Sequence, residues 1–325
     1  MAFSETFLII VIIHHYLFHG SLSISINQYN STVRSLDWIK DHDIFCSVDD
    51  SGNRMHTPLT SLNSDFRKFV YYQDKPLVAI DITNSQPYLS ILLFNPEFYQ
   101  NNKNKLNIHQ LYNQNNPIQS PLTYTSSSSH SLSSISHLSP SSTNPPPQTP
   151  FPPPMLYKTL EKADNHDVKQ YIELSENGLI YEYLGDEIHK ELGFDLRGNR
   201  KELKEVIFTV LFTGNQFIGQ QEAGPKRIFK NRFPTVYEVF SLLKRNYKKG
   251  HAILLQRIES YVVLDIISPR IRRKRPDMPI YTIHDCIVTT FDNEDYLRII
   301  MEEELISVIG HKPTLKPEYW DIEEA

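Results

Sequence analysis

The sequence predicts an α/β (α+β) fold with few strands and many helices. Three observations support this prediction. A short apolar run at residues 77–80 precedes a helical pattern, and residues 155–270 show apolar residues at helical spacing. Near the C-terminus, the segment PIYTIHDCIVTT, residues 279–290, has two β-branched apolar runs that flank a His–Asp pair instead of an ordinary turn sequence.

The composition is that of a globular protein with one large domain or two smaller ones. The chain has 325 residues, of which 40% are hydrophobic, so it has enough apolar surface for a core. Its net charge is −5, and nucleic-acid binding would therefore require local basic patches. The two cysteines, Cys46 and Cys286, form neither a disulfide framework nor a zinc pattern, which indicates a reducing compartment.

The N-terminal segment, residues 1–40, contains a mostly apolar run from Phe7 to Phe18. A membrane span needs about 20 residues, so this run matches the hydrophobic region of a signal peptide better. However, Glu5 precedes it, no Lys or Arg does, and two histidines interrupt it. We therefore favour a buried helix or a mis-assigned start, and expect a cytoplasmic, nucleoid or organellar protein without a membrane partner.

An insert separates two segments of ordinary globular composition. Residues 101–154 are rich in Asn and Gln and then in Ser and Pro, so they have little apolar surface to offset the entropy lost on ordering. We predict that this insert is disordered and loops out of the domain.

The elements follow in order along the two globular segments. Leu77 to Ile80 form a predicted buried strand that ends at Asp81, and the run from Pro87 to Phe94 is predicted to be helical. After the insert we expect helical stretches broken at Asn177–Gly178, a helix that ends near Gly214, two amphipathic helices, the His–Asp hairpin, a helix and a short tail. The predicted helical ranges are 167–192, 197–215, 235–249, 251–267 and 293–309.

Two aspartates, Asp81 and Asp285, each follow a hydrophobic strand. Side by side they would form an oxygen-rich site suited to Mg²⁺, which is often held by one or two carboxylates and substrate phosphates. Two such ions about 3.5–4 Å apart can activate an attacking hydroxyl and stabilise a leaving oxygen. Taken singly, each aspartate is more simply explained as a turn residue or a helix cap.

Four residues recur at a spacing of four on one helix: Arg200, Lys204, Phe208 and Phe212. Such spacing places them along one face, where the cations can neutralise a triphosphate and the rings can pack against base and sugar. The alternative is a solvated basic end on a helix that faces the core. A basic run, RIRRKR at residues 270–275, can contact a phosphate backbone, or can equally be a solvated loop or a patch similar to a nuclear-import signal.

Together these pieces resemble family A DNA polymerases and the related single-subunit RNA polymerases of phages and mitochondria. LVAIDITNSQPYLSILL is similar to motif A, in which a strand delivers a metal-binding Asp. RKELKEVIFTVLFTG is similar to motif B, and IHDCIVTT to motif C, the His–Asp hairpin. The motifs occur in the order A, B, C, and SGNRMHTPLTSLNSDFRKF resembles the family's entry into the palm. The resemblance covers residues 45–95 and 165–320.

The resemblance implies a polymerase palm with a small antiparallel sheet and mainly helical fingers. It assigns residues 41–100 and 271–325 to the palm and residues 155–270 to the fingers. The chain has no room for an exonuclease domain, and nothing before residue 45 is similar to a full thumb. We therefore expect a partial right-hand architecture, for which an accessory protein could supply a thumb or processivity.

The implied activity is template-directed nucleotidyl transfer, in which a primer 3′-hydroxyl attacks the α-phosphate of a nucleoside triphosphate. The implied partners are a DNA template–primer, with RNA as an alternative, and nucleoside triphosphates. The resemblance assigns two Mg²⁺ to Asp81, Asp285 and the Ile82 carbonyl. It assigns Arg200 and Lys204 to the triphosphate, with Lys204 also a proton donor to pyrophosphate.

The remaining assignments concern the base, the sugar and the nucleic acid. The resemblance assigns Phe208 and Phe212 to the base and sugar pocket. The residues that it assigns to primer or template contact are His284, Gln256, Glu259, Arg54 and Arg67.

Two departures from the family concern the sugar. Phe212 stands where motif B normally has Tyr, and Gln86 stands where the DNA polymerases have Glu, five residues after the motif A aspartate. Phe212 favours deoxyribonucleotides, while an RNA polymerase or primase variant stays open. Two other hypotheses are a truncated polymerase-like protein that binds nucleic acid without turnover, and a secreted or tethered protein with a glycosylated Ser/Pro stalk.

Overall fold

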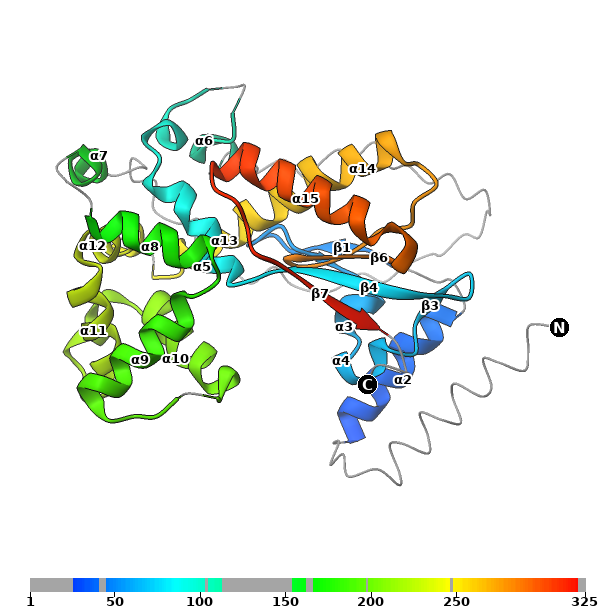
Figure 1. The fold of residues 1–325 in the computed structure, drawn as a ribbon, viewed down its shortest axis with the longest axis horizontal. Coiled ribbons are helices and arrows are strands. Elements are labelled where there is room, and N and C mark those ends of the chain that lie inside the picture. Colours follow the sequence, from blue (N-terminus) through cyan, green and yellow to red (C-terminus); the bar gives the residue numbers. More distant parts are fainter. Residues whose placement is uncertain are drawn as a thin grey trace, which may run out of the picture.

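The computed structural model describes residues 26–40, 45–102, 105–112, 154–161, 166–196, 198–245 and 248–320. In this part of the chain a small antiparallel sheet lies at one end and a group of helices at the other (Figure 1). The α+β organisation predicted from the sequence is therefore confirmed. The apolar run at residues 7–18 lies outside the described residues, and no described helix is long and apolar enough to cross a membrane.

The five-stranded sheet is built around β4 (Lys75–Ile82), which pairs antiparallel with β6 (Cys286–Thr290) and, on its other side, with β7 (Leu315–Trp320). β5 (Tyr281–Ile283) forms a hairpin with β6, and β3 (Tyr71–Tyr72) pairs with the start of β4. A separate ribbon consists of β1 (Ser47–Val48) and β2 (Met55–His56).

Helices make up most of the described chain. In order they are α2 (Ile26–Lys40), α3 (Pro58–Ser61), α4 (Ser64–Arg67), α5 (Ser85–Ser90), α6 (Ile108–Tyr112), α7 (Pro154–Glu161), α8 (His166–Glu176), α9 (Ile180–Leu192), α10 (Arg200–Phe212), α11 (Gly224–Arg232), α12 (Pro234–Lys244), α13 (Gly250–Ser260), α14 (Ser268–Lys274) and α15 (Glu294–Ile309).

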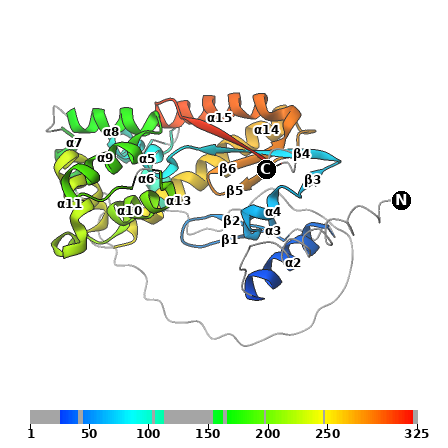
Figure 2. The same cartoon turned by 60° about the horizontal axis from the view of Figure 1, so that its bottom comes forward.

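Side chains of β4 alternate between two hydrophobic cores because successive strand residues point to opposite faces. Leu77 and Ala79 pack in the cluster that contains α3 and α4 residues, whereas Ile80 and Ile82 belong to the larger core shared with α15. Figure 2 shows α14 and α15 above the sheet and α3 and α4 below it. By the same alternation Asp81 lies on the α3–α4 side.

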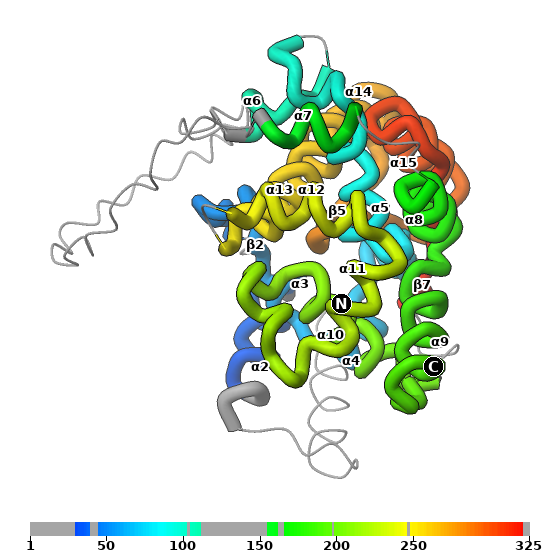
Figure 3. The backbone as a smooth tube through the Cα atoms, turned by 90° about the vertical axis from the view of Figure 1, so that its left-hand side faces the viewer, coloured from blue at the N-terminus to red at the C-terminus, as the bar shows by residue number. Residues whose placement is uncertain are grey.

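The helical end agrees with the pattern predicted from the sequence in most places. α8 and α9 are separated at Gly178, and α10, α12 and α15 lie where helices were predicted (Figure 3). The prediction of a single α-helix at residues 251–267 is wrong, because a π-helix replaces it from Tyr261 to Ile267. α14 follows directly and contains Arg270 to Lys274, so all of the basic run except Arg275 is helical and not a loop. α11 was not predicted.

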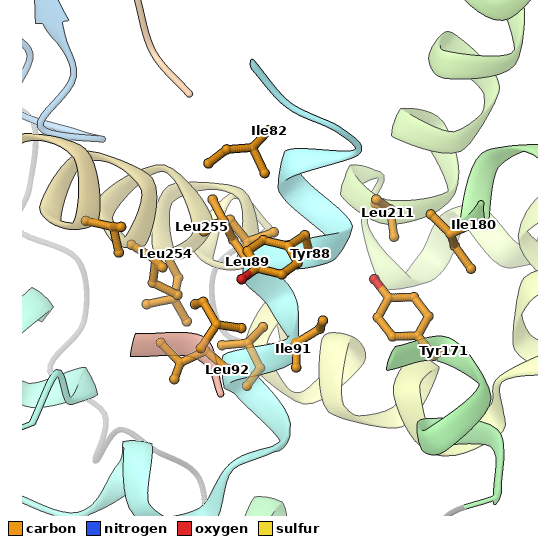
Figure 4. Close-up of a cluster of buried hydrophobic side chains, with 14 of the residues drawn as sticks. Ile82, Tyr88, Leu89, Ile91, Leu92, Tyr171, Ile180, Leu211, Leu254 and Leu255 are labelled. Carbon is orange, nitrogen blue, oxygen red and sulfur yellow. The ribbon is translucent and has the colours of Figure 1, made fainter. Parts of the chain in front are cut away.

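One continuous core joins the sheet to the helices. α5 contributes Tyr88 and Leu89, which meet Leu254 and Leu255 of α13, while Tyr171 of α8 packs from the helical end (Figure 4). All five side chains are fully buried. The strand end that carries Asp81 is therefore held rigidly against the helices.

The beginning of the predicted insert belongs to this core. Ile108 and Leu111 of α6 lie inside the range predicted to be disordered, and both side chains are buried in the larger cluster. The Ser- and Pro-rich residues 113–153 lie outside the described residues, so their predicted disorder stays a prediction.

Candidate active site

Asp81 and Asp285 meet at one end of the sheet because of the register between β4 and β6. Asp81 lies directly opposite Cys286, and Asp285 immediately precedes Cys286 at the tip of the β5–β6 hairpin. Residues opposite each other in an antiparallel pair are only about 4.5–5.5 Å apart at Cα. The structure thus brings together the two aspartates that the sequence singled out.

The hairpin tip has a positive-φ residue that could not be predicted from the sequence. β5 and β6 are joined by His284 and Asp285 alone, and His284 has a φ of +55°. A tight hairpin needs a positive φ at a central residue, which Gly usually supplies. A non-glycine residue in this region costs on the order of 1 kcal/mol, and such strain is concentrated at functional sites.

The two carboxylates repel each other. Burial, and next the Asp285 carboxylate, raise the pKa of Asp81 to about 7, while the charge of Lys204 acts in the opposite direction. Among the described residues, no hydrogen bond or ion pair to either carboxylate is found. Like charges held together without a contacting cation from the described chain are typical of a site that binds a metal ion.

The segment after β4 is fixed by the turn between α8 and α9 and by the residue before β7. The Asn84 side-chain amide donates to the Gly178 carbonyl at 2.6 Å, and the Thr83 amide donates to the Thr314 carbonyl at 2.9 Å. Gly178 has a φ of +71°, and a Cβ there would lie 2.7 Å from Cγ2 of Thr83. Glycine is therefore required at this close approach, which connects the sheet to the helical end.

Of the two cations predicted on α10, Lys204 is the one that acts on Asp81. Its charge lowers the pKa of Asp81, and its exposed ammonium lies 5.4 Å from the ring centre of Phe208. Arg200 is exposed as well, but its guanidinium forms a 2.9 Å ion pair with Glu182. Arg200 would have to leave Glu182 to bind a triphosphate.

The two rings on α10 form an aromatic edge beside Lys204. Phe208 and Phe212 make an edge-to-face contact with ring centres 5.5 Å apart, and both are partly buried against the larger core. They can therefore serve both roles considered from the sequence, namely packing in the core and packing against a base or sugar. Part of each ring packs in the core, and part remains accessible.

Two buried lysines hold the C-terminal end of α10. Lys244 donates to the Leu211 carbonyl at 2.9 Å, and Lys226 donates to the Thr213 carbonyl at 2.8 Å. They satisfy carbonyls that have no partner within the helix. Burial lowers the pKa of Lys244 to about 7 and that of Lys226 to about 8. The sequence offered no signal for this pair, which lies on α11 and α12 next to the segment after Phe212.

Three residues near the aspartates were missed from the sequence. Lys316 of β7 lies directly opposite Asp81 and lowers its pKa, whereas Glu318 raises it. Tyr181 of α9 is buried, and burial chiefly raises its pKa, with the Asp285 carboxylate among the further causes. The segment that forms β7 was expected to be a short tail. Pro317 is tolerated in this strand because, in the described part of the chain, β7 pairs with β4 alone and so is an edge strand.

Arg54, Gln86 and Glu259 form one polar network, in which Arg54 is partly buried and the other two residues are buried. Arg54 makes two hydrogen bonds to the Glu259 carboxylate, at 2.9 and 3.0 Å, and the Gln86 amide donates to it at 2.6 Å. The Glu259 side chain is 1% exposed. The sequence predicted that Glu259 contacts template or primer, but here its carboxylate contacts protein side chains only. A direct contact with nucleic acid would require it to leave these partners.

The other residues assigned to primer or template lie around this network. The His284 and His56 rings are 6.1 Å apart, and burial, followed by Arg54, lowers the pKa of His284. Gln256 is partly buried and packs so closely on Gly52 that a Cβ at Gly52 would lie 2.7 Å from the Gln256 Oε1. Arg67 lies over the Trp320 ring, with its guanidinium carbon 5.7 Å from the ring centre.

The donor atoms at the hairpin tip fit Mg²⁺. Asp81 and Asp285 supply carboxylate oxygens, and Ile82 at the end of β4 adds a backbone carbonyl nearby. Among the described residues no group of three or more His, Cys, Asp or Glu side chains is arranged to hold a metal ion. A site with so few protein ligands suits an ion that keeps its waters and binds substrate phosphates.

Comparisons with known proteins add no identification. No protein-family model matches the chain, and no curated protein matches it. The functional argument therefore depends on the geometry of the site and on the motifs in the sequence.

Proposed function

We propose that the protein is a template-directed nucleotidyltransferase similar to family A DNA polymerases, with a palm at the sheet and fingers at the helical end. The observation that carries this proposal is the β4–β6 register, which sets Asp81 beside Asp285 with Lys204 of α10 close enough to act on Asp81. The segments that resemble motifs A, B and C would thus contribute to one site, although residues 81 and 285 are far apart in sequence.

Each residue has a distinct part in this proposal. Asp81 and Asp285 would hold two Mg²⁺, which would supply activation of the primer 3′-hydroxyl and stabilisation of the leaving oxygen. Lys204 binds the triphosphate and neutralises charge that develops on the leaving pyrophosphate. The aromatic edge of Phe208 and Phe212 packs against the incoming nucleotide. DNA template–primer and deoxynucleotides are the proposed substrates.

Primer extension with Mg²⁺ tests the proposal. The wild-type protein should extend a DNA primer on a template, and Asp81→Ala and Asp285→Ala should each reduce the rate by a factor of at least about 1000. The matched control is Asp277→Asn, since Asp277 is an exposed carboxylate that pairs with Arg275. Extension that survives both alanine substitutions would refute the two-metal site.

Two other outcomes of the primer-extension assay would support the alternative functions. A wild-type protein that binds template–primer but never extends it would support the alternative of a polymerase-like protein without turnover. Extension with ribonucleotides in preference to deoxyribonucleotides would instead support the RNA polymerase or primase alternative.

A further inference from the structure

The Glu259 carboxylate occupies an unusual position between two residues assigned to different substrates. It accepts hydrogen bonds from Arg54, at 2.9 and 3.0 Å, and from Gln86, at 2.6 Å. Arg54 belongs to the group assigned to primer or template contact, and Gln86 stands at the position that the resemblance connects with the sugar of the incoming nucleotide. One buried side chain therefore touches both.

The Arg54 side of the network is anchored to the same helix as Glu259. Ser260 donates from its hydroxyl to the Gly52 carbonyl at 3.0 Å, and Arg257 donates to the Ser51 carbonyl at 2.8 Å. The loop before β2 is thus docked on α13 on either side of Glu259. Because its backbone is held, Arg54 depends on Glu259 chiefly for the direction of its guanidinium.

The Gln86 side is anchored by the strand that carries the catalytic carboxylate. Gln86 lies in the first turn of α5, five residues after Asp81, and the residue is 8% exposed. The Gln86 amide nitrogen donates the hydrogen bond to Glu259, and this bond determines the orientation of the amide group, its χ3 angle. The side-chain oxygen of Gln86 is then left as the acceptor for another group.

We propose that Glu259 is a positioning residue for nucleotide selection, which orients the Gln86 amide toward the sugar and the Arg54 guanidinium toward the primer or template as one unit. This inference rests on the proposed function. It differs from the assignment made from the sequence, because Glu259 acts through its two neighbours and does not itself contact nucleic acid.

The test measures the preference for deoxyribonucleotides over ribonucleotides, as a ratio of kcat/KM values in primer extension. Glu259→Gln keeps the shape of the side chain, but its NH₂ group cannot accept a hydrogen bond. In place of Oε2 it removes the bonds from Gln86 and from Arg54 Nη2, and in place of Oε1 it removes the bond from Arg54 Nε. A hydrogen bond to a charged group contributes about 1.5–3 kcal/mol, which corresponds to a change in the ratio of about 10- to 100-fold. Glu259→Asp, which keeps the charge, should restore part of the wild-type ratio.

A matched control separates positioning from general damage to the fold. Glu187 is also a buried glutamate, 8% exposed, and it pairs with Arg232 at 2.6 Å and with Lys190 at 2.8 Å. Glu187→Gln should lower the stability by a similar amount and leave the sugar preference unchanged. A shift of the same size in this variant would overturn the proposal.

A double-mutant cycle tests whether Glu259 acts through Gln86. In a Gln86→Met background, Glu259→Gln should no longer change the sugar preference, because the amide that it orients is gone. An equal shift in both backgrounds would overturn the proposal. If Glu259→Gln does not fold, Gln86→Met alone must change the ratio at least about 10-fold, and an unchanged ratio overturns the proposal.

The two levels of inference fail in different ways. A wild-type protein without extension activity refutes the proposed function and removes the basis of this inference with it. A wild-type protein that extends primers, together with a Glu259→Gln variant of unchanged sugar preference, refutes the positioning role alone.

Discussion

Replacing Asp81 by asparagine should make the metal-free protein more stable while it abolishes primer extension. The substitution keeps the shape of the side chain and removes one of two carboxylates that lie together without a contacting cation from the described chain. For charges about 6 Å apart at an effective dielectric constant of about 20, the repulsion is about 3 kcal/mol. Partial exposure and salt reduce this, so we expect a gain of about 1–2 kcal/mol in the free energy of unfolding.

The pH dependence follows from the pKa of Asp81, which is about 7 in the folded protein compared with 3.8 for the unperturbed group. Between these values the folded state binds more protons than the unfolded state, so the wild-type protein loses stability as the pH rises. The loss of wild-type stability that is due to Asp81 is complete above about pH 7. The advantage of Asp81→Asn should therefore be largest at about pH 8 and should shrink toward pH 5.

Urea unfolding followed by circular dichroism, in the presence of a chelator, measures this difference. The control is Asp277→Asn, for which a hydrogen bond from Arg275 lowers the pKa of the carboxyl, so its removal should bring no gain. Mg²⁺ should stabilise the wild-type protein more than the variant, since binding to the folded state adds stability. A variant that is less stable than the wild type at about pH 8, or a gain that is independent of pH, would refute the reasoning.

Three further predictions concern the residues around the site. Lys204→Ala should lower kcat/KM for the nucleotide by about 10- to 1000-fold and leave template–primer affinity nearly unchanged in a filter-binding assay, with exposed Lys201→Ala as the control; equal losses in both would contradict its role. For Lys244, whose pKa is lowered to about 7, the unfolded state binds more protons above pH 7, so wild-type stability should rise between about pH 7 and 9, with a flatter profile in Lys244→Met; parallel profiles in urea unfolding would exclude a buried, neutral amine. Gly178→Ala should lower the free energy of unfolding by about 1–3 kcal/mol, because its φ is +71° and the new Cβ would lie 2.7 Å from Thr83; calorimetry that finds no loss would contradict the close approach.

Much of the local structure was predictable because side-chain periodicity is a local property. The apolar run before Asp81 predicted β4, and the period of the later segments predicted α8 to α10, α12 and α15. The edge strand β7 was missed because Pro317 is unusual in a strand and only one of its six residues is buried. The π-helix after α13 was also missed, because the sequence of an apolar run does not distinguish an α-helix from a π-helix.

The chemical components of the site could be read from the chain alone, namely two aspartates after strands, cations and rings on one helix face, and a His–Asp pair where a turn was needed. How these components meet became visible only in the folded protein. The β4–β6 register sets Asp81 beside Asp285, and Glu259 binds Arg54 and Gln86 across separations of 205 and 173 residues. Such partners depend on how distant elements bury their apolar faces together, and a local pattern of residues does not encode that pairing.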